Sequence, residues 1–183
     1  MALTEPILLA DVKTFLRVDS SADDTFITLL ISRARVSVEQ RAGISLVEKT
    51  YIEKFHDFPA FFAPKYKPLQ SVTSIQYVDV DGETQTLAAD QYVVDYNDLY
   101  RAARIYEADG VTWPNVQDVN PEAVTLTYVA YLDSDDDIEN DALEALKQAV
   151  LLTIADWYEN RNNAAAVVNS QADAIIDMFR ATV

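Results

Sequence analysis

The single histidine, His56, is the first residue to test for catalysis or metal binding. A hydrolytic triad needs a histidine beside a nucleophile, and a zinc site needs several ligands at fixed spacing. Its neighbours Phe55, Asp57 and Phe58 form neither pattern. The chain contains no cysteine, which excludes thiolate zinc sites, cysteine nucleophiles and disulfides. We therefore expect His56 to lie at a strand end or in a loop, with no catalytic or metal-binding role.

The acidic stretch 133–144 is a candidate calcium loop. Asp133, Asp135, Asp137 and Glu144 occupy positions 1, 3, 5 and 12 of such a loop, but Ile138 replaces the glycine of position 6 that makes the sharp turn. The simpler interpretation is that these carboxylates crowd the N-terminus of a long helix and meet its partial positive charge. We expect this helix start, with no bound cofactor or metal, and keep calcium as the alternative.

A second group of carboxylates surrounds a glycine. Asp79, Asp81 and Glu83 alternate around Gly82. Paired carboxylates serve acid–base chemistry in many hydrolases, so a carboxylate-dependent enzyme stays an alternative. Asp-Gly is also a hairpin turn signal, because both residues tolerate positive φ. We expect the solvated tip of a hairpin here and no enzymatic activity.

Aromatic side chains gather on a proline-rich segment that also contains Lys65 and Lys67. One use of such a segment is base stacking on single-stranded nucleic acid. Two lysines in an acidic chain make poor phosphate contacts, whereas aromatic rings supply much contact area to protein partners. We expect a loop folded onto a sheet or a partner contact. The aromatic residues are Phe58, Phe61, Phe62 and Tyr66.

The net charge restricts the partners further. The chain has 30 acidic and 14 basic residues, a formal charge of −16. Binding to the DNA backbone needs lysine and arginine to replace counterions, and anionic membrane surfaces repel an acidic protein. The longest nearly apolar run, 149–157, is about half the length that crosses a bilayer, and the N-terminus has no signal-peptide pattern. We expect a globular protein that works away from membranes.

The periodicity of apolar residues changes twice along the chain. Leu8, Val12, Phe15 and Leu16 predict a short helix, and a second helix begins at a capping box of Ser21 and Asp24 and ends at Gly43. Strand patterns then follow until about residue 130, and helical spacing returns from Asp141. The predicted strands are 46–55, 72–78, 84–87, 91–95, 104–106 and 124–129.

This order predicts an α+β fold, a helical bundle formed by N- and C-terminal helices with an inserted antiparallel β domain. The expected boundaries are 1–45 and 134–183 for the helical core and 46–133 for the inserted domain. Leu151 and Leu152 lie off the stripe of the long helix, which leaves apolar surface for a neighbour. Trp157 and Tyr158 are expected to pack against the first helices, with a subunit contact as the alternative. Ile175, Met178 and Phe179 mark a short last helix, another candidate contact.

Three stretches together resemble the head–tail connector (adaptor) family of tailed bacteriophages. They are 9–43, with the sequence LADVKTFLRVD and the arginine-punctuated helix after it; 68–95, with PLQSVTSIQYVD, Asp81-Gly82 and YVVD; and 146–161, with LKQAVLLTIADWYENR. They span nearly the whole chain in the family's order. None is a catalytic signature, so the resemblance depends on their combination.

The resemblance implies a virion structural protein, without covalent chemistry, in the neck between head and tail. Identical subunits are expected to form a ring, a dodecamer matched to the portal, that extends the DNA channel and docks the tail or a stopper. The partners implied are the portal protein, a stopper or tail-completion protein, and double-stranded DNA passing through the lumen. An acidic lumen would repel DNA and let it slide. A stopper or tail-completion protein of the neck is the nearest alternative.

The candidate subunit or partner contacts come from two parts of the chain. Phe61, Phe62 and Tyr66 belong to the aromatic segment, and the others belong to the last two helices: Leu151, Leu152, Ile175, Met178 and Phe179.

Overall fold

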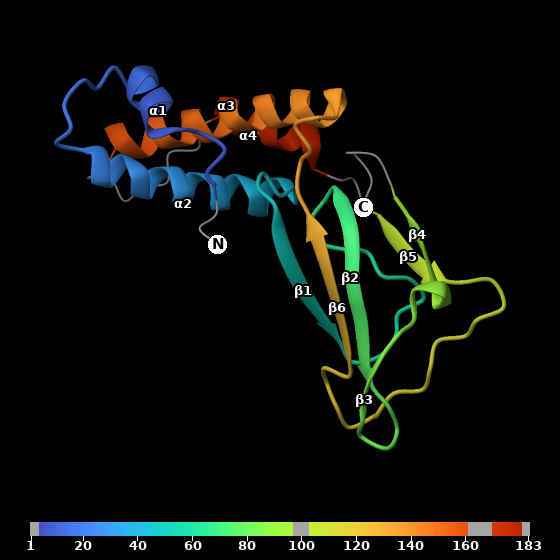
Figure 1. The fold of residues 1–183 in the computed structure, drawn as a ribbon. Helices are drawn as coiled ribbons and strands as arrows, with labels where there is room; N and C mark the ends of the chain where they lie inside the picture. Colours follow the sequence, from blue (N-terminus) through green and yellow to red (C-terminus); the bar gives the residue numbers. More distant parts are fainter. Residues whose placement is uncertain (1–3, 97–102, 161–169, 181–183) are drawn as a thin grey trace. The chain divides into compact units, whose positions relative to one another are not determined.

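The computed structural model describes residues 4–96, 103–160 and 170–180. The chain forms two compact units, a helical unit of Met1–Val47 with Leu132–Val183 and a β unit of Glu48–Tyr131. Helices from both ends of the chain lie in the first unit, and antiparallel strands form the second (Figure 1). The predicted α+β fold class, with an inserted antiparallel β domain, is confirmed.

The helical unit is built around two long helices that lie side by side, α2 (Asp24–Ala42) and α3 (Asp137–Glu159) (Figure 1). The shorter helices α1 (Leu9–Leu16) and α4 (Ser170–Phe179) each pack against this pair. Apolar side chains on the facing sides of α2 and α3 are buried, as helical spacing requires: Ile27, Leu30, Ile31, Ala34, Val38, Leu143, Leu146, Ala149, Val150 and Ile154. No described helix is long and apolar enough to span a membrane.

Helix α2 ends as predicted but begins differently. Gly43 has a φ of 66° and donates its N–H to the Glu39 carbonyl, the left-handed C-terminal geometry expected of glycine. The predicted capping box of Ser21 and Asp24 is wrong. Asp24 is paired with Lys13 at 2.6 Å, and Asp23 accepts the Tyr158 hydroxyl hydrogen bond at 2.6 Å. Contacts to α1 and α3 therefore replace local capping.

The last turn of α3 contains two aromatic residues. Trp157 is half-buried, and its neighbour Tyr158 contacts α2 as predicted, through Asp23 and through the Phe26 ring, whose centroid is 6.3 Å away. Tyrosine fits this position because its hydroxyl can donate a hydrogen bond to a carboxylate while its ring packs against apolar side chains. Residue 161, the last of the third family-like stretch, lies outside the described residues.

The first helix buries less than its apolar stripe predicts. Val12 is fully buried, but Leu8 is 64% exposed and Phe15 is 40% exposed. Leu8 precedes the helix as its N-cap, and the chain turns at Arg17 with a φ of 57° after only two helical turns. So short a helix presents a single row of side chains to α2 and α3, and the residues beside that row face outward.

A buried ionic cluster connects the N-terminal segment to α2 and to the chain that follows it. The Arg35 guanidinium binds Glu39 at 2.8 Å and Glu5 at 2.7 Å. Ser32 donates to Glu5, and the Leu46 N–H donates to Glu39 at 2.9 Å. Burial opposes the charge, but the hydrogen bonds and charges of the two carboxylates raise the pKa of Arg35 above its ordinary value.

The described part of the β unit contains six strands in two antiparallel sheets. The larger sheet has the order β1-β6-β2-β3 and the smaller pairs β4 with β5. A single bridge between Phe62 and Ile105 joins the aromatic segment to β5. All six strands were predicted, with ends displaced by up to three residues. Their bounds are β1 Lys49–Phe55, β2 Leu69–Val78, β3 Thr84–Thr86, β4 Tyr92–Asp95, β5 Arg104–Glu107 and β6 Val124–Ala130.

The boundary error at the start of β1 has a clear cause. Leu46 and Val47 have strand-like sequence but are buried in the helical unit, where Leu46 is held by Glu39. The strand therefore begins only at Lys49. Burial in the helical core overrides the local preference for extended pairing.

The core of the β unit lies on one face of the large sheet. In β6, Val124, Leu126, Tyr128 and Ala130 are buried and alternate with half-buried Thr125, Thr127 and Val129. Tyr128 is fully buried, and its hydroxyl donates to Glu53 Oε1 at 2.5 Å and accepts the Tyr66 N–H at 3.2 Å. Burial, together with the Glu53 carboxylate, raises the pKa of Tyr128 far above its ordinary value.

Replacing Arg35 by alanine should lower the free energy of unfolding by about 3–5 kcal/mol, because Glu39 and Glu5 would lose their cation. Equilibrium denaturation with urea measures this change. Arg33→Ala, at an exposed position of the same helix, is the matched control and should stay within about 0.5 kcal/mol of wild type. Equal effects of the two substitutions would contradict a structural role for the buried cluster.

Tyr128→Phe should cost about 1–3 kcal/mol, because Glu53 and the Tyr66 N–H lose a buried partner. The variant should also be less sensitive to alkali. The folded protein holds the Tyr128 proton above the ordinary tyrosine pKa of about 10, so this contribution is complete below that pH and is lost as pH rises past it. Urea denaturation between neutral pH and mild alkali tests this, with the exposed Tyr96→Phe as control. The same alkaline slope in wild type and Tyr128→Phe would contradict it.

Candidate assembly surfaces

The residues first tested for chemistry lie at a strand end, a helix start and a hairpin tip. His56 is exposed, and its Nε2 lies 3.1 Å from the Asp118 carbonyl oxygen. It lies directly after β1, at the predicted strand end. Within the described ranges, no group of three or more histidine and carboxylate side chains could hold a metal ion.

The acidic stretch before α3 forms a helix start. Asp136 is the N-cap, and its carboxylate accepts the Ile138 and Glu139 N–H groups at 3.0 Å each. Asp133 accepts the Asp135 N–H, so it serves the turn. Glu144 faces along the helix to Lys147 at 2.6 Å. The carboxylates act on backbone donors and a lysine, as the helix-start interpretation predicted.

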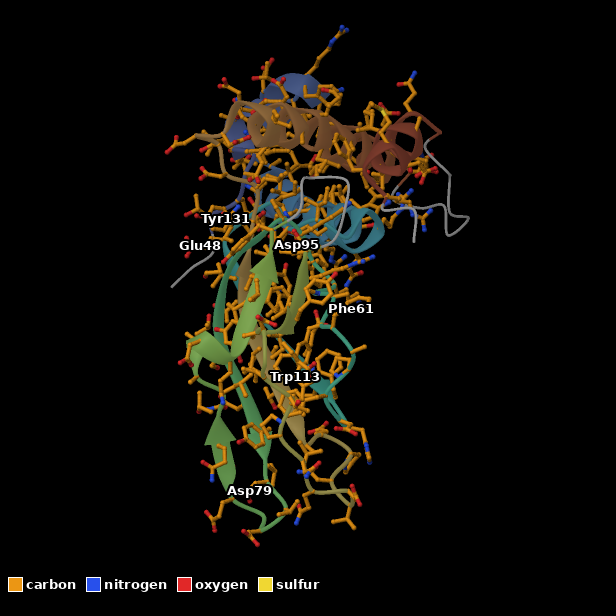
Figure 2. The ribbon with its side chains drawn as sticks, turned by 90° about the vertical axis from the view of Figure 1, so that its right-hand side faces the viewer. Glu48, Phe61, Asp79, Asp95, Trp113 and Tyr131 are labelled. Carbon is orange, nitrogen blue, oxygen red and sulfur yellow. The ribbon has the colours of Figure 1, made fainter. Side chains whose placement is uncertain are left out.

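The second carboxylate group forms the tip of the hairpin between β2 and β3. Asp79 accepts the Glu83 N–H at 2.9 Å, the Asp81 N–H at 3.0 Å and the Gln85 amide at 2.8 Å. These hydrogen bonds lower the pKa of Asp79 below its ordinary value, and the bond from Gln85 has the largest effect. Asp79 therefore shapes the turn, at the end of the β unit remote from Glu48 and Tyr131 (Figure 2).

The aromatic segment after β1 is divided between core and surface. Phe62 is fully buried and meets Phe55, Phe58 and Trp113 at centroid distances of 5.2 to 6.1 Å. Tyr66 is half-buried and stacks on Tyr51 at 4.2 Å. Most of this aromatic area therefore covers the sheet within its own chain, as the first of the two alternatives predicted.

Phe61 is the member of the segment that faces outward (Figure 2). The Arg104 guanidinium lies 4.8 Å from its ring centroid and Tyr106 lies 5.6 Å from it. The three side chains form a small aromatic and cationic patch contributed by the segment and β5. Such a patch suits contact with a protein partner, because arginine and aromatic residues dominate binding interfaces.

The candidate contacts on the last two helices differ in exposure. Met178 is 67% exposed, whereas its neighbour Phe179 is buried in the helical unit. Leu151, Leu152 and Ile175 are half-buried. Met178 and the half-buried leucines can meet a neighbour directly. Phe179 and Phe62 lie inside their own units and can influence a contact only by supporting exposed neighbours.

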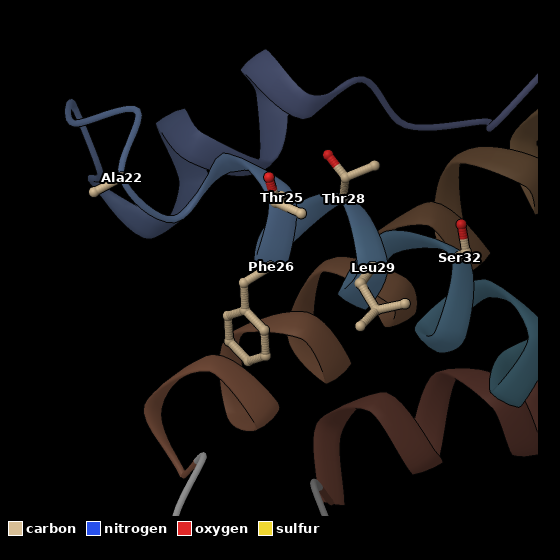
Figure 3. A pocket seen from close by; sticks show the side chains of 6 residues that line it. All are labelled: Ala22, Thr25, Phe26, Thr28, Leu29 and Ser32. Atoms are coloured by element: carbon tan, nitrogen blue, oxygen red, sulfur yellow. The ribbon is translucent and has the colours of Figure 1, made fainter.

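The N-terminal half of α2, with Ala22 before it, lines an apolar hollow that the sequence interpretation did not include. Ala22, Thr25, Phe26, Thr28, Leu29 and Ser32 line it (Figure 3). Leu29 is half-exposed, and Val36 extends the same side of the helix two turns later. The signal was present in the sequence, since Leu29 and Val36 are spaced seven apart and lie off the buried stripe of α2.

Large apolar side chains are thus exposed on several helices of the helical unit. Leu8 is the N-cap of α1, Phe15 lies in α1, Leu29 and Val36 lie on α2, and Met178 lies on α4. Single exposed apolar residues are ordinary on protein surfaces. Their recurrence on different helices of one small unit gives it several candidate contact surfaces.

Comparison with known proteins gives a family and a fold. A model of the family described as "Phage gp6-like head-tail connector protein" matches residues 6–104. No curated protein matches the chain.

Three similar structures come from gene transfer agent (GTA) particles, each 22% identical over all of this chain and 97% of the other. A chain of the virion of the native particle has a TM-score of 0.73, one of the neck of the empty particle computed with C6 symmetry has 0.74, and one of the neck of the native particle computed with C12 symmetry has 0.67. At this identity the similarity establishes the shared fold.

The family match covers more than half of the 183 residues, from the segment before α1 to the first residue of β5. The chain therefore belongs to the phage gp6-like head–tail connector family and is a structural protein of the virion neck, where head and tail join.

Proposed function

We propose that this connector is the adaptor subunit of the neck: identical copies form a ring beneath the portal, extend the DNA channel and dock the tail or a stopper. It performs no covalent chemistry in this role. The observation on which the proposal depends most is the apolar surface of the helical unit, exposed on α1, α2 and α4.

The symmetry of the similar structures supports a ring. Those chains come from necks computed with C6 and C12 symmetry, and the present chain shares their fold over its full length. A closed ring of identical subunits joins two different faces of each copy head to tail. Exposed residues on separate helices, Leu8 and Phe15 on one and Leu29 and Val36 on another, are the kind of paired surfaces that such contacts require.

The charge of the chain supports the channel. At −16 per subunit, copies repel one another unless their contacts are largely apolar or pair opposite charges. An acidic lumen repels the phosphate backbone, so DNA would pass without binding. The partners proposed are the portal protein above, a stopper or tail-completion protein below, and double-stranded DNA within.

Stoichiometry in the particle is the direct test. Symmetry-free reconstruction of the neck should place twelve copies in a ring against the portal. A sixfold ring nearer the tail would identify a stopper or tail-completion protein instead. A single isolated copy away from the vertex would contradict a ring-forming adaptor.

Leu29→Ser should weaken assembly without unfolding the subunit, because the exposed leucine lines the hollow along α2 and contributes little to the core. Losing a buried leucine from a subunit contact costs about 1–3 kcal/mol per interface. The fraction of particles with a complete neck, measured by electron microscopy, should therefore fall while the melting temperature stays near wild type. Gln40→Ser, exposed on the same helix, is the control. A lower melting temperature with normal assembly would place Leu29 in the fold instead of the interface.

A further inference from the structure

The large sheet of the β unit has two edges without a neighbouring strand among the described residues. In the order β1-β6-β2-β3, β1 lies at one edge and β3 at the other (Figure 1). β1 is seven residues long and pairs with β6 in continuous register from Lys49↔Ala130 to Phe55↔Val124. A long edge strand without a bulge or a proline is an open template for another strand.

The side chains of β1 fit a covered edge. Ile52, in the middle of the strand, is 63% exposed, between the exposed Thr50 and Lys54 on the same face. Across the sheet, the row through Lys54 continues with Thr125, Gln76 and Thr86, none of them acidic. β1 contains two lysines, Lys49 and Lys54, and one carboxylate, Glu53, which accepts the Tyr128 hydroxyl and the Lys65 N–H within its own chain. β1 therefore has a net charge of +1 in a chain whose net charge is −16.

The opposite edge is anionic. β3 follows the turn that contains Asp81 and Glu83, and its residues Thr84–Thr86 are all exposed. Among the described residues, the Asp81 and Glu83 carboxylates make no side-chain hydrogen bond or ion pair, because Asp79 alone accepts the bonds that shape the turn. Two carboxylates without a described side-chain partner, Asp81 and Glu83, therefore lie just before this short open strand.

Strand direction permits the two edges to meet. Every neighbouring pair in the sheet is antiparallel, so β1 and β3 of one copy run in opposite directions. A β1 strand added beside the β3 strand of a second copy in the same orientation is therefore antiparallel too. Repetition of this step by rotation joins the edges head to tail, as a ring requires.

We propose that β1 of one copy pairs with β3 of the adjacent copy in the neck ring, with Ile52 covered and Lys54 facing the neighbour's Asp81 and Glu83. The strand that pairs with the β1 edge is thus β3 of a second copy of this chain. Opposite charges and the antiparallel strand direction favour this partner. This inference rests on the proposed ring and adds the contact that joins its subunits.

Engineered cysteines test the pairing on a chain that has none of its own. Ile52→Cys and Thr86→Cys are combined in one chain, and intact necks from assembled particles are treated with a short bismaleimide. A ladder of cross-linked multimers is expected on a denaturing gel. The control pair combines Ile52→Cys with Val119→Cys, an exposed residue outside the sheet, and should give at least about tenfold less multimer.

Charge reversal tests the pairing without cross-links. Lys54→Glu and Asp81→Lys should each reduce the fraction of complete rings at least about fivefold, and the double variant should recover to within about twofold of wild type. Lys54 is also ion-paired with Glu122 in its own chain, so Glu122→Gln is the matched control and should leave ring formation within about twofold of wild type. Melting curves of the subunits identify any variant that fails to fold.

The outcomes separate the two proposals. Wild-type necks without a ring of this chain would overturn the proposed function itself. Rings that form normally, but give no ladder when Ile52→Cys and Thr86→Cys are combined and show no recovery in the double charge reversal, would overturn the strand pairing and leave the adaptor role standing. A ladder together with recovery supports both.

Discussion

The packing of α2 against α3 is the constraint on which the rest of this protein depends. The two helices are separated by the entire β unit in the sequence, so the chain must leave the helical unit after Val47 and return at Leu132. Their shared core includes Leu30, Ala34 and Leu146. Burial of such side chains stabilises the unit by about 1.5–3 kcal/mol each, which offsets the entropy of closing a long loop.

Polar interactions then fix the details of that packing. Arg35 joins Glu39 to Glu5, and Glu39 also holds the Leu46 N–H. Through these bonds, the residues before α1 and the residues after α2 are tied to one buried guanidinium. The same pattern recurs in the β unit, where Tyr128 brings Glu53 and the Tyr66 N–H together. In each unit, one buried polar group orders chain segments that have no regular secondary structure.

A head–tail connector works by binding its neighbours, so it needs contact surfaces. The net charge of −16 limits which parts of the surface can serve as contacts. Like-charged copies can approach only where carboxylates are absent or paired. The apolar sides of α1, α2 and α4, the Phe61 patch and the β1 edge satisfy that condition. The acidic hairpin at Asp81 and Glu83 supplies the opposite charge. A strongly acidic subunit can in this way remain soluble and still assemble in a defined direction.

Local sequence patterns were sufficient to predict the order of elements, the α+β class and the family. Periodicity located all six strands and the four helices of the described chain, Gly43 marked the end of α2, and the lack of cysteine removed whole classes of chemistry. These features are local, because period, turn residues and composition can be read within one segment. The candidate contacts were chosen on the same grounds, and there the local pattern was not sufficient.

Which of those apolar residues are covered depends on contacts between segments that are distant in the sequence. Phe61 and Phe62 are adjacent in sequence, yet one faces outward and the other is fully buried against Trp113, which belongs to a distant part of the chain. The sequence pattern predicts a strand at Leu46, but this residue is buried with the helices. The same kind of pattern predicts that Leu8 is buried, but it is exposed. Exposure depends on which distant segment packs on a residue, and sequence spacing within one element holds no information about that partner.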